Sequence, residues 1–242
     1  MISLAAFEQT LHQNWADSFH CPRETIHEAG TTLLPMEKYA GDKLVIFWHI
    51  GAHSFAQLDP HYASQLTDLL TGLPVGTSLS GADLQRAWGD AVKSIDLGLI
   101  HYLFPPDLPA FAPAPLFTLR QLTEADAAHM ISLHDANTPE DVDEGYVEVT
   151  HEIAFGCFAD GQLAAAASGY TRTGFMDIGV LVHPGFRHKG LGKAVVGAVC
   201  EWTIRTGVIA QYRHNVLNAG SGRVAKSLNF RQYFKSESIW MK

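Results

Sequence analysis

The sequence predicts a mixed α/β protein, of the α+β type, that is built from two domains. The prediction rests on the chain length, on a proline-rich interruption near the middle, and on strand-like and helix-like apolar spacing on both sides of it. The chain has 242 residues, of which 47% are hydrophobic and 17% are charged. This composition is typical of globular proteins, and the length fits one large domain or two of about 100–150 residues.

The interruption lies between residues 104 and 117 and reads FPPDLPAFAPAPLF. Proline has no amide hydrogen and excludes regular helix, so this run favours an extended connection. We therefore expect an N-terminal α/β domain over residues 1–110 and a second domain over residues 116–242. The strand and helix texture of the first domain suggests a degenerate, partial copy of the fold of the second.

The N-terminal half contains one clear strand signal and two helix signals. Residues 43–51 (KLVIFWHIG) are rich in β-branched and aromatic side chains, which predicts a buried strand. Residues 61–73 and 80–95 have apolar spacing typical of helices, with Ser80 as the N-cap of the second. No motif in this half predicts a particular chemistry.

The C-terminal half alternates between strand and helix signals more regularly. A strand over 116–122 precedes a helix that is opened by a capping box of Thr123 and Asp126. The pair Asp160-Gly161 then joins two apolar runs, which predicts a β-hairpin. The remaining expected elements are a strand over 175–182 that Pro184 ends, a helix over 190–206, a strand over 208–214, a helix over 219–228 and a strand over 231–240.

Charge and targeting signals limit the classes of partner. The net charge of −8 argues against a nucleic-acid-binding protein and fits neutral or cationic small partners. The N-terminus lacks the basic start and apolar core of a signal peptide, and no apolar run reaches the ~18–20 residues of a membrane span. We therefore expect a cytoplasmic protein with no nucleic-acid partner and no membrane partner.

The cysteines and histidines predict neither disulfides nor a metal centre. The three cysteines are widely spaced and form no C-x-x-C motif, which indicates buried thiols in a reducing compartment. Among the 13 histidines, His49 and His53 flank a strand-like run, where a spacing of four does not bring side chains together. We expect no metal site.

A basic, glycine-containing loop precedes the helix predicted from residue 190. The first turn of a helix has unpaired amides and a partial positive charge, so it attracts anions, phosphate above all. The loop from Arg187 to Lys193 is therefore interpreted as a phosphate-binding turn, with a solvated surface loop as the alternative. It is not a Walker A loop, because Ala194 follows Lys193, and not a Rossmann fingerprint, because Val195 stands where a third glycine is required.

The stretch VHPGFRHKGLG, residues 182–192, resembles the R-x-x-G-x-G/A signature of the GNAT (Gcn5-related N-acetyltransferase) superfamily. Arg187, Gly190 and Gly192 occupy the three signature positions. The segment NAGSGRVAKSLNF, residues 218–230, resembles the next conserved segment of that family, with Asn229 in place of its glycine. The resemblance covers about half of the chain and implies the GNAT acyl-CoA N-acyltransferase fold in its C-terminal half.

The resemblance also implies that acetyl-CoA is the co-substrate. In this family, loop amides bind the diphosphate, a splayed strand pairs with the pantetheine arm, and an asparagine contacts pantetheine from the other side. The implied cofactor-binding residues here are Val180, Leu181, Val182, Arg187, His188, Lys189, Gly190, Leu191, Gly192, Lys193, Asn218 and Ser221.

The catalytic residues are less well defined, because the sequence departs from the family here. Many members have a tyrosine acid five residues before the position of Phe230, and this chain has Ala225 there. The acid would then be Tyr212, Tyr233 or a water molecule. The candidate bases are Asp177, Glu148 and Glu152, although a carboxylate in such a position is more often solvated or structural than catalytic.

The resemblance implies transfer of an acetyl group to a primary amine. Residues 116–173 contain 10 acidic and 2 basic side chains, against 3 and 10 in residues 174–242. The acidic run from Asp135 to Glu152 therefore suggests attraction of a small cationic amine, with a solvated loop as the alternative. A non-catalytic acyl-CoA sensor and a structural partner domain are the rival functions, and the oligomeric state is open between a monomer and a homodimer.

Overall fold

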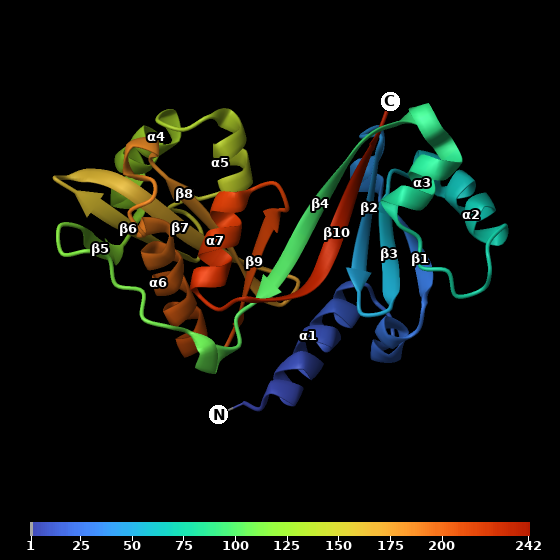
Figure 1. The fold of residues 1–242 in the computed structure, drawn as a ribbon, viewed down its shortest axis with the longest axis horizontal. Helices are drawn as coiled ribbons and strands as arrows, with labels where there is room; N and C mark the ends of the chain where they lie inside the picture. The colour runs from blue at the N-terminus through green and yellow to red at the C-terminus, as the bar shows by residue number, and fades with distance from the viewer. Residues whose placement is uncertain (1) are drawn as a thin grey trace. The chain divides into compact units, whose positions relative to one another are not determined.

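The computed structural model describes residues 2–242 (Figure 1). The chain forms two compact units. The first extends to Ile100 and includes Asn215–Leu217 and Tyr233–Lys242, and the second comprises His101–His214 and Asn218–Gln232. The boundary expected at the proline-rich run assigned the C-terminal strand to the second domain. The structure places it in the first unit, because residues 235–240 pair with a strand of that unit.

The first unit is built on strands in the order β1-β3-β2-β10-β4. Strands β1 and β3 are parallel, whereas β2 pairs in the antiparallel sense with both β3 and β10. The strands are β1 (Gly30–Pro35), β2 (Leu44–Ile50), β3 (His53–Leu58), β4 (Val92–Tyr102) and β10 (Arg231–Met241), and the helices are α1 (Leu4–Ser18), α2 (Ala63–Thr71) and α3 (Gly81–Trp88).

The sequence predicted part of this unit correctly. Strand β2 and helix α2 lie where they were expected, and Ser80 caps α3 in a capping box with Asp83. The helix expected over 80–95 is too long, since α3 ends at Trp88 and residues from Val92 onward form β4. Gly89, which follows α3, has a φ of 52°, and this left-handed conformation ends the helix.

The second unit is a five-stranded sheet in the order β9-β8-β7-β6-β5, with helices on both faces. Strands β8 and β9 are parallel, and the other neighbours are antiparallel. The strands are β5 (Thr118–Gln121), β6 (Ile153–Ala159), β7 (Gln162–Arg172), β8 (Phe175–Val182) and β9 (Ile209–Asn215), and the helices are α4 (Ala127–Asp135), α5 (Pro139–Gly145), α6 (Leu191–Thr206) and α7 (Ala219–Ser227).

Alternation along β8 sends its side chains to two different cores. Met176 and Ile178 lie in a buried cluster with α6 and α7. Leu181 lies in a second cluster, with α4 and with Val142 of α5. One face of this sheet is therefore covered by α6 and α7, and the opposite face by α4 and α5.

Short 3-10 turns join several of these elements. They are Arg23–His27, Glu37–Tyr39, Pro60–Tyr62, Gly89–Ala91, Pro105–Asp107, Glu124–Asp126 and Pro184–Phe186. Within residues 2–242 no helix is both long enough and apolar enough to cross a bilayer. The three cysteines are free: Cys157 and Cys200 are buried as expected, whereas Cys21 is partly exposed.

The local signals of the second unit are confirmed. Asp160 and Gly161 both have positive φ, as the tight turn between β6 and β7 requires. Thr123 and Asp126 form the predicted capping box, although it opens a 3-10 turn before α4 begins. Asn229 has a φ of 59°, which is the left-handed conformation expected where the family has glycine.

The buried carboxylate of Asp126 stabilises the turn that precedes α4. It accepts hydrogen bonds from the Thr123 amide at 3.0 Å and from the two terminal nitrogens of Arg120 at 2.9 and 2.6 Å. The bonds from Arg120 are the main reason why the pKa of Asp126 falls to about 2. Since this folded-state pKa lies below the unfolded value, the ionised carboxylate stabilises the fold above about pH 4, and the effect is lost as the pH falls toward 2.

We predict that Asp126→Asn lowers the free energy of unfolding at pH 7 by on the order of 1–2 kcal/mol. The difference from the wild type should shrink as the pH is lowered from 5 toward 2, in urea unfolding measured at each pH. Asp68→Asn, at an exposed position of α2, is the control, and its difference in stability from the wild type should change little with pH. A difference between wild type and Asp126→Asn that stays constant down to pH 2 would contradict the assignment.

Candidate functional site

Two parallel strands diverge at one side of the sheet of the second unit. Strands β8 and β9 pair from Phe175 and Ile209 as far as Ile178 and Tyr212. Strand β8 continues to Val182, but in the described chain this continuation is unpaired on its β9 side. A cavity of about 540 Å³ lies where the strands part, with Ile178 to Val182 along one wall.

The chain that follows α5 crosses β8 at the point of divergence. A Cβ atom on Gly179 would lie 1.9 Å from the Gly145 carbonyl oxygen and 2.9 Å from that of Tyr146. Glycine at position 179 is therefore required for two backbone segments to pack directly against each other. Gly145 and Gly179 both line the cavity.

The N-terminus of α6 presents free backbone amides to the cavity. The first amide of this segment to be bonded is that of Ala194, which donates to the Gly190 carbonyl at 3.2 Å. Within residues 2–242 the amides of 188–193 have no hydrogen-bond acceptor. His188 and Gly190 have φ values of 64° and 77°, a local alternation of backbone conformation typical of anion-binding turns. The predicted phosphate-binding turn therefore has the donors that it needs.

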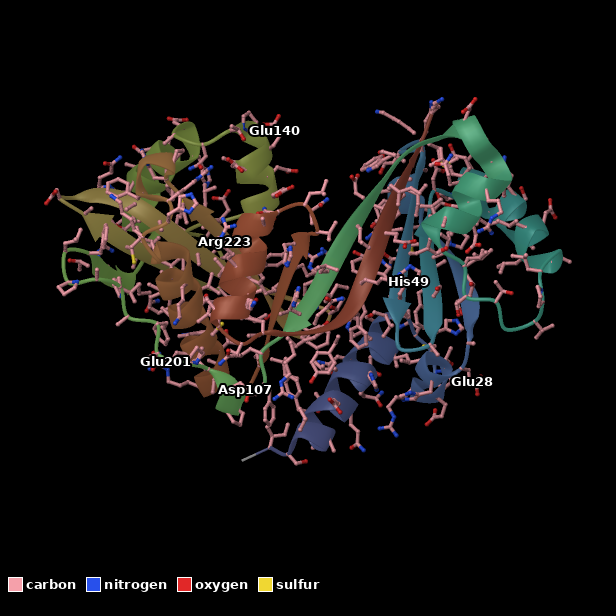
Figure 2. The ribbon with its side chains drawn as sticks, in the orientation of Figure 1. Glu28, His49, Asp107, Glu140, Glu201 and Arg223 are labelled. Carbon is pink, nitrogen blue, oxygen red and sulfur yellow. The ribbon has the colours of Figure 1, made fainter. Side chains whose placement is uncertain are left out.

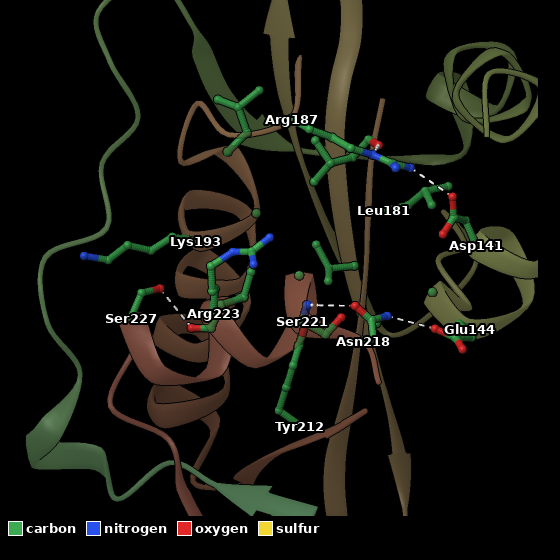
Figure 3. Close-up of a pocket in the computed structure, with 18 of the residues that line it drawn as sticks. Asp141, Glu144, Leu181, Arg187, Lys193, Tyr212, Asn218, Ser221, Arg223 and Ser227 are labelled. Carbon is green, nitrogen blue, oxygen red and sulfur yellow. Dashed lines mark hydrogen bonds and ion pairs between the residues drawn. The ribbon is translucent and has the colours of Figure 1, made fainter. Parts of the chain in front are cut away.

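Basic side chains surround these amides on two sides (Figure 3). Arg187 and Lys193 line the cavity from the loop and the first turn of α6, and Arg223 lines it from α7. Lys189, by contrast, does not line the cavity, and its ammonium lies 4.9 Å from the centroid of the Phe186 ring. All the other predicted cofactor-binding residues line it: Val180, Leu181, Val182, Arg187, His188, Gly190, Leu191, Gly192, Lys193, Asn218 and Ser221.

Helix α5 contributes two carboxylates to the opposite wall. Asp141 accepts a hydrogen bond from Arg187 at 2.9 Å, and Glu144 accepts one from the Asn218 side chain at 2.8 Å (Figure 3). The sequence analysis did not predict this helix and treated its residues as part of an acidic run. The pair Thr138-Pro139 was an available signal, because Thr138 caps the helix by accepting from the Asp141 amide and proline is favoured in the first turn.

The remaining members of the acidic run lie elsewhere. Glu140 projects from the outer side of α5 and is exposed, as are Asp135 and Asp143 (Figure 2). The structure thus divides the run: Asp141 and Glu144 face the cavity, whereas these three face solvent.

Asn218 and Ser221 are held at the start of α7. The Asn218 side-chain oxygen caps the helix by accepting from the Ser221 amide at 3.0 Å. The Tyr212 side chain extends from β9 toward Ser221 (Figure 3). Burial raises the pKa of Tyr212 to about 12, so its phenol is protonated at neutral pH.

The position at which the family usually has a tyrosine acid is occupied here by a buried alanine. Ala225 of α7 is buried in the same cluster as Tyr212 and Leu228. A hydroxyl group is instead supplied to the cavity by Tyr212, which lines it. Of the two predicted acids, Tyr233 lies in the first unit, where its hydroxyl is 3.3 Å from Glu8.

Two of the candidate bases are already engaged. Asp177 is buried and accepts hydrogen bonds from Arg213 through both of its oxygens, and from the Tyr170 hydroxyl at 3.0 Å. Glu152 accepts from the Thr171 amide at 2.7 Å and from the Thr171 hydroxyl at 3.0 Å. These bonds favour structural roles for both carboxylates.

Glu148, the third candidate base, lies beside a histidine that the sequence analysis did not select. Its amide donates to the Ser168 hydroxyl at 3.1 Å, and the His151 ring contacts the same hydroxyl at 2.8 Å. Burial lowers the pKa of His151, with the charges of Glu148 and Glu152 opposing the shift. No local motif marks His151, because its partners are brought to it by the pairing of β6 with β7.

Comparison with known proteins finds a family match over the residues that carry this site. Residues 119–230 match the model of the Acetyltransferase (GNAT) family. A search of curated proteins found no match to the chain.

Solved structures share the fold at low sequence identity. A GCN5-related N-acetyltransferase from Sphaerobacter thermophilus is 14% identical, with a TM-score of 0.56 over 77% of this chain and 71% of that one. A GNAT-family acetyltransferase from Colwellia psychrerythraea is 16% identical, with a TM-score of 0.51 over 79% and 77%. A Drosophila protein, also 16% identical, has a TM-score of 0.52 and covers 98% of this chain and 88% of its own. The predicted mixed α/β class and GNAT fold are confirmed.

We predict that Gly179→Ala destabilises the protein, because its methyl group would collide with the backbone of Gly145. The expected loss is about 2–3 kcal/mol, or a fall in Tm of about 4–12 °C, measured by thermal unfolding. Gly72→Ala is the control, since a Cβ there meets its nearest neighbour at 3.6 Å and should change Tm little. Equal Tm values for the two variants would show that the strand and the crossing segment are not packed as described.

Proposed function

We propose, from the match of residues 119–230 to the Acetyltransferase (GNAT) family model, that the chain transfers an acetyl group from acetyl-CoA to a primary amine of a small cationic acceptor. The observation that carries the proposal is the set of free amides from His188 to Lys193 beside the divergence of β8 and β9. Together they offer an anion site and an unpaired strand edge at the ends of one cavity.

The anion site fits the diphosphate of coenzyme A. Backbone amides at the start of α6 would donate to its oxygens, and Arg187 would add a charge-assisted hydrogen bond. Lys193 and Arg223 extend the positive lining beyond the amides. This combination supports binding of a multiply charged phosphate ester better than it supports binding of a single carboxylate.

The strand edge fits the pantetheine arm. Past Ile178 the backbone groups of β8 that face β9 have no strand partner in the described chain, and the amide groups of pantetheine can supply one. Asn218 and Ser221 border the same cavity from α7. Pairing of this kind would direct the thioester toward the point where the strands diverge, beside Gly179 and Arg213.

The reaction proposed at that point is direct attack of a neutral amine on the thioester carbonyl carbon. A C–N bond forms, the C–S bond breaks, one amine proton passes to a base or to water, and the thiolate receives a proton. Tyr212 is our candidate for the acid, since it is protonated at neutral pH and its hydroxyl is next to Ser221 in the cavity. Glu148 is our candidate for the base, because Asp177 and Glu152 are held by other partners.

A non-catalytic acyl-CoA sensor is the second candidate function. It is favoured by the methyl group of Ala225 at the family's acid position and by the ion pair that occupies Asp177. Calorimetry with CoA and an assay of acetyl transfer to a panel of amines separate the two functions. Tight CoA binding without turnover on any polyamine, aminoglycoside, amino acid or peptide would favour the sensor, and no CoA binding would eliminate both.

We predict that Gly190→Ala weakens CoA binding by about tenfold or more in calorimetry, because alanine is strained at a φ of 77° and would reorient the adjacent amides. Gly207→Ala is a closely matched control. Gly207 has a φ of 78° at the opposite end of α6, and a Cβ at either glycine meets nothing within 4 Å. Both variants should lose similar stability, but only Gly190→Ala should lose affinity. Equal CoA affinities of the two variants would show that the turn from His188 to Lys193 does not bind CoA.

We predict that Tyr212→Phe lowers kcat by about 100-fold while leaving the KM for acetyl-CoA within about twofold, because it removes a proton donor but keeps the buried ring. The readout is thiol release with an amine that the wild type acetylates. An unchanged kcat would assign protonation of the thiolate to water instead.

A further inference from the structure

Three aromatic rings meet on the sheet face that α4 and α5 cover. The ring centroids of Tyr146 and His151 are 5.0 Å apart, those of His151 and Tyr170 are 5.0 Å apart, and those of Tyr146 and Tyr170 are 5.3 Å apart. The two tyrosines meet edge to face, with an angle of 82° between their planes. Tyr146 follows α5, His151 lies in the loop before β6, and Tyr170 belongs to β7. Because the three residues are separated in the sequence, no local motif predicts the cluster.

This aromatic cluster adjoins the end of the cavity where β8 and β9 part. Tyr146 directly follows Gly145, which lines the cavity, and its carbonyl oxygen lies against Gly179. The Tyr170 hydroxyl donates to Asp177, which in turn binds the cavity-lining Arg213. The cluster is therefore connected to the cavity through both of its tyrosines.

The cluster is accessible from solvent. Tyr146 is 53% exposed, and Tyr170 and His151 are only partly buried. Tyr146 also adopts a left-handed conformation, with φ of 41° and ψ of 56°, which is unusual for a bulky residue. The fold thus holds a large ring at the surface in a strained backbone conformation, which costs free energy.

The electrostatic surroundings favour a positive ligand. Glu148 and Glu152 are both close enough to His151 to raise its pKa, while burial of the imidazole lowers that pKa and so favours its uncharged form. Of the cations near the cluster, Arg213 is neutralised by its ion pair with Asp177, and Arg172 interacts with the Tyr170 side chain. Aromatic faces with carboxylates nearby attract alkylammonium groups through cation–π and Coulombic interactions.

We propose that Tyr146, His151 and Tyr170 form the acceptor subsite, in which their rings bind the ammonium group of an aliphatic amine beside the acyl end of the cavity. The proposal rests on the proposed function, because it places the second substrate of that reaction. It specifies a substrate class: an amine on an alkyl chain, bound through charge and ring contact rather than through a dedicated ion pair. Glu148 lies at the rim, where it would accept the proton that the ammonium loses before attack.

The test uses a pair of probes that have nearly the same shape but differ in charge. Choline carries a trimethylammonium group, and 3,3-dimethylbutan-1-ol carries a neutral tert-butyl group in its place. Neither has a primary amine to acetylate. Their binding to the CoA-saturated full-length chain is measured by ligand-observed NMR titration, in the wild type, in Tyr146→Phe and in Tyr146→Leu.

The wild type should bind choline at least about fivefold more tightly than the alcohol, and Tyr146→Phe should keep this preference because it keeps the ring. Tyr146→Leu, which keeps apolar bulk but removes the ring, should lose most of the preference. Equal binding of the two probes by the wild type, no saturable binding of choline, or an undiminished preference in Tyr146→Leu would each overturn the proposal.

Calorimetry with CoA on the same three proteins separates this proposal from the proposed function. CoA should bind all three with similar affinity. If CoA binds but the choline preference is absent, the acceptor subsite is wrong and the cofactor site stands. The probes are also titrated without CoA. If CoA does not bind the wild type, but choline still binds more tightly than the alcohol and Tyr146→Leu loses this preference, the cation site is supported and acetyl transfer is contradicted.

Discussion

The functional part of this molecule depends on the failure of two parallel strands to stay paired. Strands β8 and β9 pair with each other only as far as Ile178 and Tyr212, and beyond Ile178 the edge of β8 that faces β9 has no strand partner among the described residues. Unpaired backbone in a protein interior is costly unless water or a ligand satisfies it. Here the unpaired edge of β8 lies along the cavity, where water or a ligand can reach its backbone groups. The gap in strand pairing thus provides a place where a ligand can bind.

The other features of the site are arranged around this divergence. Gly179 lets the segment after α5 lie directly on β8, which brings carboxylates and an aromatic ring to one side. Helix α6 begins where β8 ends, which brings free amides and basic side chains to the other. In the proposed function the site has a cationic end for phosphate and an aromatic, acidic end for an amine. The sequence has the same division, because the acidic residues of this unit are concentrated before residue 174 and its basic residues after it.

Much of the second unit could be predicted from sequence because its signals are local. A capping box, a two-residue hairpin turn and a glycine-rich helix start each act over a few neighbouring residues, and each was found where it was expected. The long-range pairings were not predictable in the same way. Nothing near Asp177 in the sequence indicates that Arg213, on the neighbouring strand, occupies both of its oxygens. The aromatic cluster and the pairing of β10 with β2 were missed for the same reason, since each depends on strand neighbours rather than on chain neighbours.

Helix α5 has a further consequence for how the two ligands meet. One end of this seven-residue helix is tied to the phosphate side through Asp141 and Arg187, and the chain leaving its other end carries Tyr146. In the proposed function an incoming diphosphate would compete with Asp141 for the same guanidinium, and a displacement of Asp141 would pass along about two turns of helix to the ring beyond it. The affinities for the two substrates would then be thermodynamically linked, and by reciprocity each substrate would alter the affinity for the other by the same factor. The linkage would be carried by a helix that belongs to neither site alone.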